Sequence, residues 1–269
     1  MALRRRLAQL KAKLHLRLGM PGEAVALLDY SHPIRISVSS PMEYHTRLHS
    51  CKKEPETIEW IERQFRPGDT FYDIGANVGT YTLVAASFWG EGLRVVAVEP
   101  SPVNFARLTR NLALNGVEER VTALPVALGT ACGILPFHCE NLVAGGSLHA
   151  LGEARDYRGR LFTPVATYPT LTYDLDTLIE QFGLPPPTHL KLDVDGTELA
   201  ILQGAERTLR NVRTLLVELD EHHPDQQGIR AFLKEAGFRE TGSYPYRYAK
   251  KWKQFEGMMN VIFQKEKSA

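Results

Sequence analysis

The sequence has few cysteines and no long apolar run. Cys51, Cys132 and Cys139 are too sparse for a disulfide framework, and their spacing fits neither a Cys-x-x-Cys motif nor a Cys/His metal site. We therefore expect three reduced thiols. No stretch of about 18 apolar residues is present, which excludes a membrane-spanning helix. Residues 1–20 lack the apolar core of a secretion signal, so the expected location is cytoplasmic.

The sequence also lacks an excess of charge of either sign. It has 32 Lys and Arg residues and 31 Asp and Glu residues, which gives a formal net charge of +1. Such a balance does not provide the basic surface typical of a nucleic-acid-binding protein, so we expect no specific nucleic acid as a partner. A chain of 269 residues with 43% hydrophobic residues can bury one core and carry an extension. We therefore predict one active site in one large domain.

The most unusual local composition lies in residues 1–20, which contain six basic residues and no acidic one. Leu3, Leu10, Leu14 and Leu18 recur at roughly helical spacing, so the segment is predicted to form a basic amphipathic helix. Two interpretations stay open. In the first, which we favour because ordinary amphipathic helices are common, the leucines pack on the domain. In the second, the helix docks on an anionic membrane surface or on a carrier protein.

The remaining chain alternates predicted strands and helices. We assign residues 1–52 to the basic helix and an irregular extension with a short strand at 34–38, and residues 53–269 to one domain. Strands are expected at 70–76, 94–100, 121–129, 189–196, 213–223 and 257–266. Helices are expected at 54–65, 77–89, 101–116, 176–184, 197–210 and 225–238. This alternation predicts an α/β fold with a doubly wound, mostly parallel sheet, interrupted by an insertion at about 133–175 near the substrate pocket.

The strongest motif is Asp73-Ile74-Gly75-Ala76-Asn77-Val78-Gly79, at a predicted junction of strand and helix. Gly75 and Gly79 allow the backbone to approach a ligand closely. A dinucleotide enzyme prefers a glycine where Asn77 stands, and Asp73 would repel a pyrophosphate. A carboxylate suits S-adenosylmethionine, which carries a sulfonium and an ammonium group. The alternative is a tight turn in which Asp73 only caps the helix.

Glu99 is expected at the end of the second strand of the domain, about twenty residues beyond the glycine loop. A carboxylate at this place accepts hydrogen bonds from both ribose hydroxyls of a nucleoside cofactor. NAD enzymes have the same feature, so Glu99 alone does not separate the two classes. Pro100 turns the chain away from the sheet, and Ser101 before Pro102 is predicted to cap a helix.

Three segments together resemble the FkbM-type methyltransferase family. They are DIGANVGTYTL, VVAVEPSPVNFARLTRNLALN and LKLDVDGTELAILQGAERTL, in this order. The resemblance implies the class I methyltransferase fold, which is Rossmann-like with a seven-stranded sheet, and S-adenosyl-L-methionine as the cofactor. It also implies methylation of a hydroxyl on a small molecule such as a sugar, a polyketide or another secondary metabolite.

The same resemblance implies roles for individual residues. Asp73, Gly75, Asn77 and Gly79 would surround the methionine half of the cofactor, and Glu99 would hold the ribose. Ala76 and Pro100 complete the predicted cofactor-binding set. The loop Gly145-Gly146-Ser147 is similar to a family feature near the pocket. Asp195 stands where glutamate is the commoner family residue. This departure leaves the identity of the acceptor open, but it does not affect the implied binding of the cofactor.

Methyl transfer is an in-line displacement, so the enzyme must align donor and acceptor, and an alcohol acceptor must also lose its proton. Asp193 is the first candidate for the base or the acceptor-positioning group, and Asp195 is either catalytic or only part of a turn. His222 is a candidate base because histidine titrates near neutral pH, although it fits a solvated loop equally well. Further candidates are Glu198, Asp220, His223, and His149 in the insertion.

Other functions remain possible at this point. The carboxylates near Asp193 would suit magnesium, but their spacing is not a metal signature, so no metal ligands are predicted. An NAD(P)-dependent oxidoreductase shares the fold, and a non-catalytic binding protein would use it as a scaffold. A nucleic-acid or protein methyltransferase is the third alternative, but no Asn-Pro-Pro-aromatic string follows Asp193. The expected partner is a hydroxylated small molecule, and the sequence leaves the oligomeric state open.

Overall fold

A seven-stranded sheet forms the centre of the protein. The computed structural model describes residues 2–247 and 255–266, and residues 1, 248–254 and 267–269 lie outside this part. In sheet order the strands are β12 (Phe238–Pro245), β13 (Met258–Lys265), β11 (Thr214–Asp220), β10 (His189–Leu192), β3 (Asp69–Ile74), β4 (Leu93–Val98) and β5 (Val121–Leu124). Only the pairings of β13 with its two neighbours are antiparallel, which confirms the predicted α/β fold with a mostly parallel sheet.

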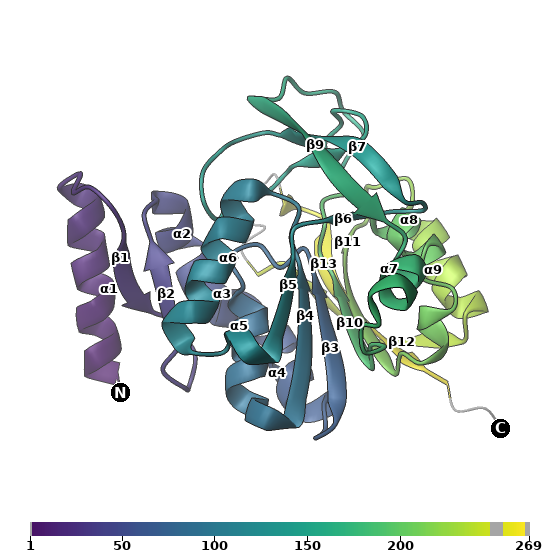
Figure 1. Ribbon diagram of the computed structural model, residues 1–269, viewed down its shortest axis with the longest axis horizontal. Coiled ribbons are helices and arrows are strands. Elements are labelled where there is room, and N and C mark those ends of the chain that lie inside the picture. The colour runs from purple at the N-terminus through teal and green to yellow at the C-terminus, as the bar shows by residue number, and fades with distance from the viewer. Residues whose placement is uncertain (1, 248–254, 267–269) are drawn as a thin grey trace.

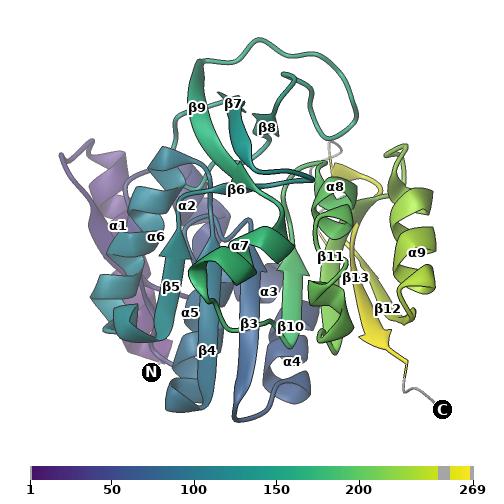
Figure 2. The ribbon, with the colours of Figure 1, turned by 45° about the vertical axis from the view of Figure 1, so that its right-hand side comes forward.

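Helices cover both faces of this sheet, as expected for a doubly wound fold (Figures 1 and 2). One face packs against α4 (Pro55–Gln64), α5 (Thr80–Trp89) and α6 (Pro102–Asn115). The other face packs against α7 (Leu175–Phe182), α8 (Glu198–Gln203) and α9 (Gln226–Glu235). Successive side chains of β3 alternate between the two layers: Phe71 packs in the first layer, and Tyr72 packs in the second. Both layers are apolar, so the strands read as continuous hydrophobic runs.

Two predicted elements are divided in the structure. The expected strand 121–129 is broken at Pro125, so that only β5 belongs to the central sheet while β6 (Ala127–Leu128) joins a second one. The expected helix 197–210 ends at Gln203, and a 3-10 turn follows at Thr208–Arg210. Gly204 caps the end of this helix and lies against another part of the backbone, where an added Cβ would be 2.2 Å from the carbonyl oxygen of Gly129.

Strand β12 was not predicted at all. It is an edge strand whose side chains, except that of Phe238, are exposed or half-buried. Its sequence, FRETGSYP, contains a glycine and a proline and no apolar alternation. Such a strand is held by backbone hydrogen bonds to β13 and not by burial, so hydrophobic periodicity cannot reveal it.

A second, four-stranded sheet lies over the carboxyl ends of the central strands (Figures 1 and 2). Its strand order is β6-β9-β7-β8, with β7 at Gly133–Cys139, β8 at Ala150–Leu151 and β9 at Ala166–Tyr173. Most of this second sheet comes from the insertion predicted at about 133–175. The loop 140–149, between β7 and β8, projects from this sheet toward the turn after β3.

The segment before α4 is more regular than predicted. It begins with α1 (Ala2–Arg17) and continues with β1 (Ala24–Leu27), β2 (Arg35–Val38), α2 (Pro41–His45), a 3-10 turn (Arg47–His49) and α3 (Ser50–Lys53). The expected strand at 34–38 is β2, which pairs with β1. A capping box starts α2, because Ser40 and Glu43 satisfy each other's backbone amides.

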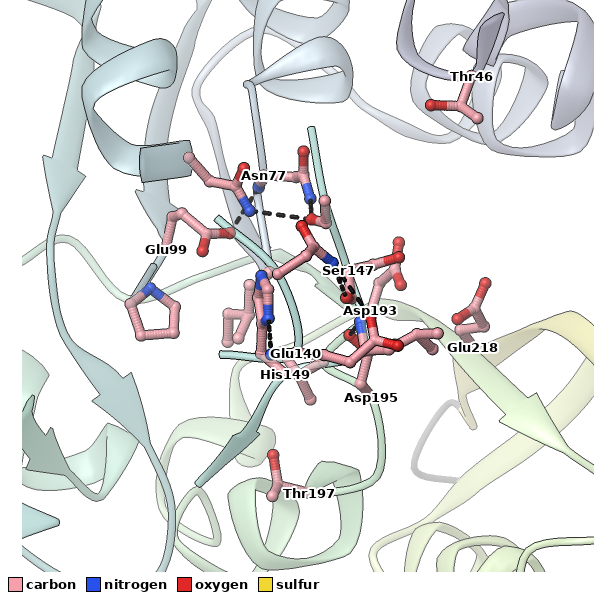
Figure 3. A pocket seen from close by; sticks show the side chains of 18 of the residues that line it. Thr46, Asn77, Glu99, Glu140, Ser147, His149, Asp193, Asp195, Thr197 and Glu218 are labelled. Carbon is pink, nitrogen blue, oxygen red and sulfur yellow. Dashed lines mark hydrogen bonds between the residues drawn. The ribbon is translucent and has the colours of Figure 1, made fainter. Parts of the chain in front are cut away.

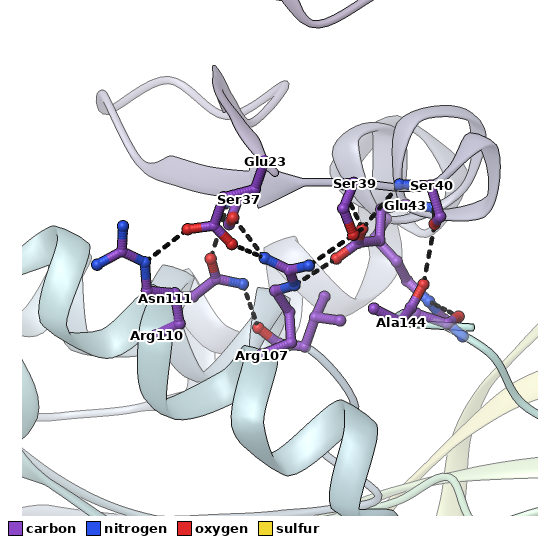
Figure 4. Close-up of polar contacts among 12 residues, drawn as sticks. Glu23, Ser37, Ser39, Ser40, Glu43, Arg107, Arg110, Asn111 and Ala144 are labelled. Carbon is purple, nitrogen blue, oxygen red and sulfur yellow. Dashed lines mark hydrogen bonds and ion pairs between the residues drawn. The ribbon is translucent and has the colours of Figure 1, made fainter. Parts of the chain in front are cut away.

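Arg107 of α6 fixes this N-terminal segment to the domain (Figure 4). Its Nε atom lies 2.7 Å from Glu43 Oε1, and its other guanidinium nitrogens contact Glu23 and donate to Ser39 Oγ at 2.6 Å. In the same contact, Asn111 Oδ1 accepts a hydrogen bond from the backbone N–H of Ser37 at 2.9 Å. The segment is therefore joined to α6 by buried polar contacts.

The favoured interpretation of the first helix is wrong in one respect. Of the leucines of α1, Leu16 packs against the core. The others point away from the domain and are 50% to 70% exposed: Leu3, Leu7, Leu10 and Leu14, together with Leu18 just beyond the helix. The helix instead faces β1 through Ala12, which is fully buried, and through Gln9, which donates to the carbonyl of Leu27. A small side chain at position 12 allows the close approach that a leucine would prevent. Within the described residues, no helix combines the length and the apolar character that crossing a bilayer requires.

Candidate active site

A cavity of about 480 Å³ opens at the carboxyl ends of β3, β4, β10 and β11. From β3, the strand order continues through β4 and β5 on one side, and the later strands β10 and β11 lie on the other side. The cavity therefore lies at the switch point of the sheet. The loop 140–149 and helix α2 supply further walls. This is the position where doubly wound proteins bind ligands.

The turn after β3 brings backbone to the cavity surface. Gly75 has a φ of +79°, and an added Cβ would lie 1.8 Å from the carbonyl oxygen of Asp193, so only glycine fits where β3 and β10 end side by side. Asn77 follows with a φ of +53°. Its backbone N–H donates to Glu99 Oε2 at 2.8 Å, and its side-chain amide donates to the carbonyl of Gly146 at 2.7 Å (Figure 3).

Four of the seven predicted cofactor-binding residues line the cavity: Gly75, Asn77, Glu99 and Pro100. Three lie behind its surface. Ala76 is buried, Gly79 faces Leu108, and Asp73 is fully buried beneath the turn. Asp73 Oδ2 accepts hydrogen bonds from the backbone N–H and the hydroxyl of Thr82, so this carboxylate fixes the start of α5.

Glu99 is held by two backbone amides. Its Oε1 accepts from the N–H of Ser101 at 2.8 Å, and its Oε2 accepts from the N–H of Asn77. Burial raises the pKa of Glu99 to about 7, and these two hydrogen bonds oppose that rise. Each carboxyl oxygen keeps a free lone pair, so the group can accept hydrogen bonds from a pair of neighbouring hydroxyls.

Asp193 is paired with a buried lysine. The Nζ of Lys191 lies 2.7 Å from Asp193 Oδ2 and 3.8 Å from Asp73 Oδ1. Burial alone would raise the pKa of Asp193, but the ammonium group of Lys191 outweighs it and lowers that pKa to about 2. Asp193 therefore stays charged near neutral pH, and its low pKa makes it a weak proton acceptor.

Asp195 holds the loop above the cavity. Its Oδ2 accepts from the backbone N–H of Leu148 at 2.7 Å, and burial and the charge of Asp193 raise the pKa of Asp195 to about 7. Asn77, Leu148 and Asp195 are the non-glycine residues with positive φ in the part of the chain that the structure describes, and all three line the cavity. Backbone strain of this kind clusters at functional sites.

Glu218 is a cavity residue that the sequence analysis missed. Burial, with repulsion from Asp193 and Glu54, raises its pKa well above the usual value of a glutamate. No described residue donates a hydrogen bond to its carboxyl group. A signal was present: Glu218 interrupts the apolar run of β11, and its neighbours Val217 and Leu219 belong to the core on the opposite face.

The loop 140–149 is fixed from several sides, and it places His149 at the cavity. The carbonyl of Gly145 accepts from Arg47 Nε at 2.9 Å, and the carbonyl of Gly146 accepts from the side-chain amide of Asn104 at 3.0 Å. Gly146 and Ser147 line the cavity, as the sequence motif suggested. Burial and the nearby charge of Arg47 lower the pKa of His149 to about 4, so its imidazole is neutral at pH 7.

The remaining candidates lie elsewhere. The side chain of His222 is 53% exposed and does not line the cavity. Glu198, Asp220 and His223 line a small neighbouring hollow, where Asp220 pairs with Arg158 at 2.7 Å. Across residues 2–247 and 255–266, no three His, Cys, Asp or Glu side chains gather closely enough to hold a metal ion.

Comparison with known proteins identifies the family. The sequence model of the Methyltransferase FkbM domain matches residues 73–240, more than half of the chain. The protein belongs to the FkbM methyltransferase family. This FkbM protein is therefore an enzyme that transfers methyl groups, and its family implies S-adenosylmethionine as the donor. The predicted resemblance and enzyme class are confirmed, and the oxidoreductase alternative loses its support.

Three curated relatives of this FkbM protein illustrate the family. The hexuronic acid methyltransferase AglP of Haloferax volcanii is 25% identical over 236 residues, which cover 88% of this chain and 90% of that protein. Methyltransferase sdnD of Sordaria araneosa is 31% identical over 62% of this chain and 72% of its own length. The 31-O-demethyl-FK506 methyltransferase FkbM of Streptomyces tacrolimicus is 26% identical over 65% and 74%.

Proposed function

We propose that the protein methylates a hydroxyl oxygen of a small molecule, of the sugar or secondary-metabolite class. The observation that carries this proposal is Glu218, a carboxyl group with raised pKa and no hydrogen-bond donor from the described residues, on the wall of the cavity opposite the turn after β3. In its ionised form such a group can take the proton of an alcohol, and its raised pKa makes it a stronger base than an ordinary carboxylate. The names of two relatives, a hexuronic acid methyltransferase and an O-demethyl-FK506 methyltransferase, support this acceptor class.

The cavity fits S-adenosylmethionine at the turn between β3 and α5. Glu99 is proposed to accept hydrogen bonds from the ribose hydroxyls, because both of its oxygens are already oriented by backbone amides. Gly75 lines the cavity, and because it lies against the backbone of Asp193, the turn after β3 and the end of β10 can together form the wall beside the methionine half. The charged carboxylate of Asp193 lies beside this turn and would attract the ammonium and sulfonium groups of the donor.

Bound S-adenosylmethionine would supply an electrophilic methyl group for the acceptor oxygen, with the thioether S-adenosylhomocysteine as the leaving group. Glu218 accepts the hydroxyl proton during this step. Asp193, held by Lys191, orients the hydroxyl in line with the methyl group, which is the main requirement of a displacement reaction. The second sheet and the loop 140–149 cover the site and exclude water.

Asp195 and His222 are assigned differently from the sequence analysis. We propose that Asp195 positions the loop through Leu148, since this hydrogen bond already uses one of its oxygens. His222 would have to leave its exposed position to reach the acceptor. We therefore propose Glu218 as the base in its place.

Calorimetry with S-adenosylhomocysteine tests the donor site. Glu99→Gln should weaken binding about 10- to 100-fold, because it alters charged hydrogen bonds worth roughly 1.5–3 kcal/mol. Glu118→Gln, at an exposed position, is the matched control and should bind normally. Failure of the wild-type protein to bind the product, or unchanged binding by Glu99→Gln, would overturn the assignment. Methyl-labelled donor with panels of alcohols and amines then tests the acceptor class, and label that enters only amines would refute O-methylation.

A further inference from the structure

The N-terminal helix presents a leucine stripe to the outside of the molecule. Residues three or four positions apart lie on one side of a helix. The stripe consists of Leu3, Leu7, Leu10, Leu14 and Leu18, each at least half exposed. Figure 1 shows α1 as the outermost element at one edge of the protein. The opposite side of the helix is fixed to the domain by Ala12, Gln9 and Arg5, the last of which donates to the carbonyl of Tyr30.

Exposed cations border this stripe on both sides. With 100° per residue, Arg6, Lys13 and Arg17 follow one border, and Arg4 and Lys11 follow the other. All five side chains are exposed, and none forms an ion pair with a described residue. The helix contains no acidic residue. Its outward face is therefore apolar in the middle and positive at both borders.

We propose that α1 docks the protein on a bilayer that contains anionic lipid. The helix lies in the plane of the interface, with its leucines at the boundary of the acyl chains. The long side chains of the lysines and arginines reach up to the lipid phosphates, which their charge complements. With only 16 residues, and many of them charged, α1 lies on the membrane and does not cross it.

Pairing of two copies through the same stripe is disfavoured by charge. Leucines spaced in this way can form the seam of a coiled coil, but the positions that flank such a seam normally carry charges of opposite sign. Here both copies would bring only cations to the flanks, and like charges repel. An anionic lipid surface removes this repulsion, so it is the occupant that the charges favour.

Docking through α1 would place one wall of the active site near the bilayer. Helix α1 contacts α2, whose Pro41, Met42 and His45 line the cavity. Met42 is 40% exposed. The docking proposal does not depend on the chemistry of the acceptor, so it can fail without affecting the proposed reaction.

Sedimentation with lipid vesicles tests the proposal on the full-length protein. Vesicles of phosphatidylcholine mixed with phosphatidylglycerol should bind the wild-type protein, and vesicles of phosphatidylcholine alone should bind it at least tenfold more weakly. The triple variant Leu7→Gln, Leu10→Gln and Leu14→Gln should lose this binding. The control variant Leu161→Gln and Leu171→Gln changes exposed leucines elsewhere and should bind like the wild type.

A second variant tests the role of charge. Replacing Arg6, Lys13 and Arg17 with glutamine should weaken binding to the mixed vesicles about 100-fold, and added salt should have a similar effect on the wild type. Both variants should fold normally, since the changed side chains are exposed. Circular dichroism and the methyl-transfer rate in the absence of lipid check this expectation.

Three results would overturn the proposal. The first is no binding of the wild type to the mixed vesicles. The second is binding that the leucine triple variant retains. The third is a dimer, detected by light scattering, that the leucine variant abolishes, because the stripe would then be an interface between copies.

Discussion

The two ends of the central sheet differ in how their buried charged groups are paired. At the amino end, each polar group has a partner. His189 Nε2 lies 2.9 Å from Asp69 Oδ2, Thr214 Oγ1 lies 2.7 Å from His189 Nδ1, and Trp60 Nε1 donates to Thr214 Oγ1 at 2.9 Å. Arg213 also pairs with Asp69. These contacts join β3, β10, β11 and α4 into one network.

At the carboxyl end, several carboxyl groups lie close together, and four of them form no ion pair with a described residue: Glu99, Asp195, Glu198 and Glu218. Burial raises the pKa values of Glu99, Asp195 and Glu198 to about 7, and that of Glu218 rises as well. Such an arrangement weakens the folded state, but it provides groups that can bind a cationic donor and accept a proton. The amino end is thus organised for stability, and the carboxyl end for chemistry.

The largest expected effect is on catalysis. Glu218→Gln should lower kcat about 10²- to 10⁴-fold, since it removes the proposed proton acceptor. Its stability should be unchanged or higher, because the substitution removes repulsion with Asp193 and Glu54. Assays with labelled donor and calorimetry of S-adenosylhomocysteine separate the two effects. The exposed neighbour Glu221→Gln serves as the control. An unchanged kcat in Glu218→Gln would refute its role.

A substitution at the amino end of the sheet should lower stability and leave binding at the donor site unchanged. Asp69→Ala leaves the buried His189 and the half-exposed Arg213 without their shared acceptor, and an unsatisfied buried hydrogen-bonding group costs about 1–3 kcal/mol. Urea unfolding measures this loss. The folded fraction should bind S-adenosylhomocysteine with wild-type affinity, because the network is at the other end of the strands. The comparison between the two ends would break down if Asp69→Ala lost affinity but not stability.

A fall in pH should lower the free energy of unfolding through His189 at the amino end of the sheet. Burial, only partly offset by Asp69, lowers the pKa of His189 to about 4, whereas an unfolded histidine titrates near 6.5. The unfolded chain therefore binds more protons between these values. The contribution of His189 is complete above about pH 6.5 and is lost as the pH falls toward 4, by about 3 kcal/mol in total. Urea unfolding between pH 7 and pH 5 should show this slope, and His189→Gln should flatten it.

The carboxyl end should show an effect of similar size and opposite sign. Glu198 has a raised pKa, so the folded form binds the extra proton, and stability is lost as the pH rises from about 4.5 to about 7. Glu198→Gln should therefore stabilise the protein more at pH 8 than at pH 5, by roughly 2–3 kcal/mol. Chemical unfolding at both values measures the difference. Equal effects at the two pH values would show that the charge of Glu198 is not the cause.

The sequence predicted the sheet because alternating apolar strands and amphipathic helices report burial directly. It located Gly75, Asn77 and Glu99 because local spacing places them at strand ends. It named Asp193 as a base or acceptor-positioning group, but it did not reveal the ion pair with Lys191, because that contact depends on how the two side chains turn in the fold. It missed Glu218 because the search favoured residues after the strand over one inside it. The outward leucines of α1 were missed because periodicity shows that a helix has two faces but not which one meets the domain.

The contacts of Ser40 and Arg47 with the loop 140–149 have a consequence for how relatives diverge. These two residues hold the carbonyls of Ala144 and Gly145, yet they precede the region 73–240 that defines the family. The walls of the cavity thus come from two parts of the chain: Glu99, Asp193 and Glu218 lie within the family region, whereas Pro41, Met42 and His45 precede it. Exchanging residues 20–53 between family members would give chimeras with a new acceptor preference and the old donor site.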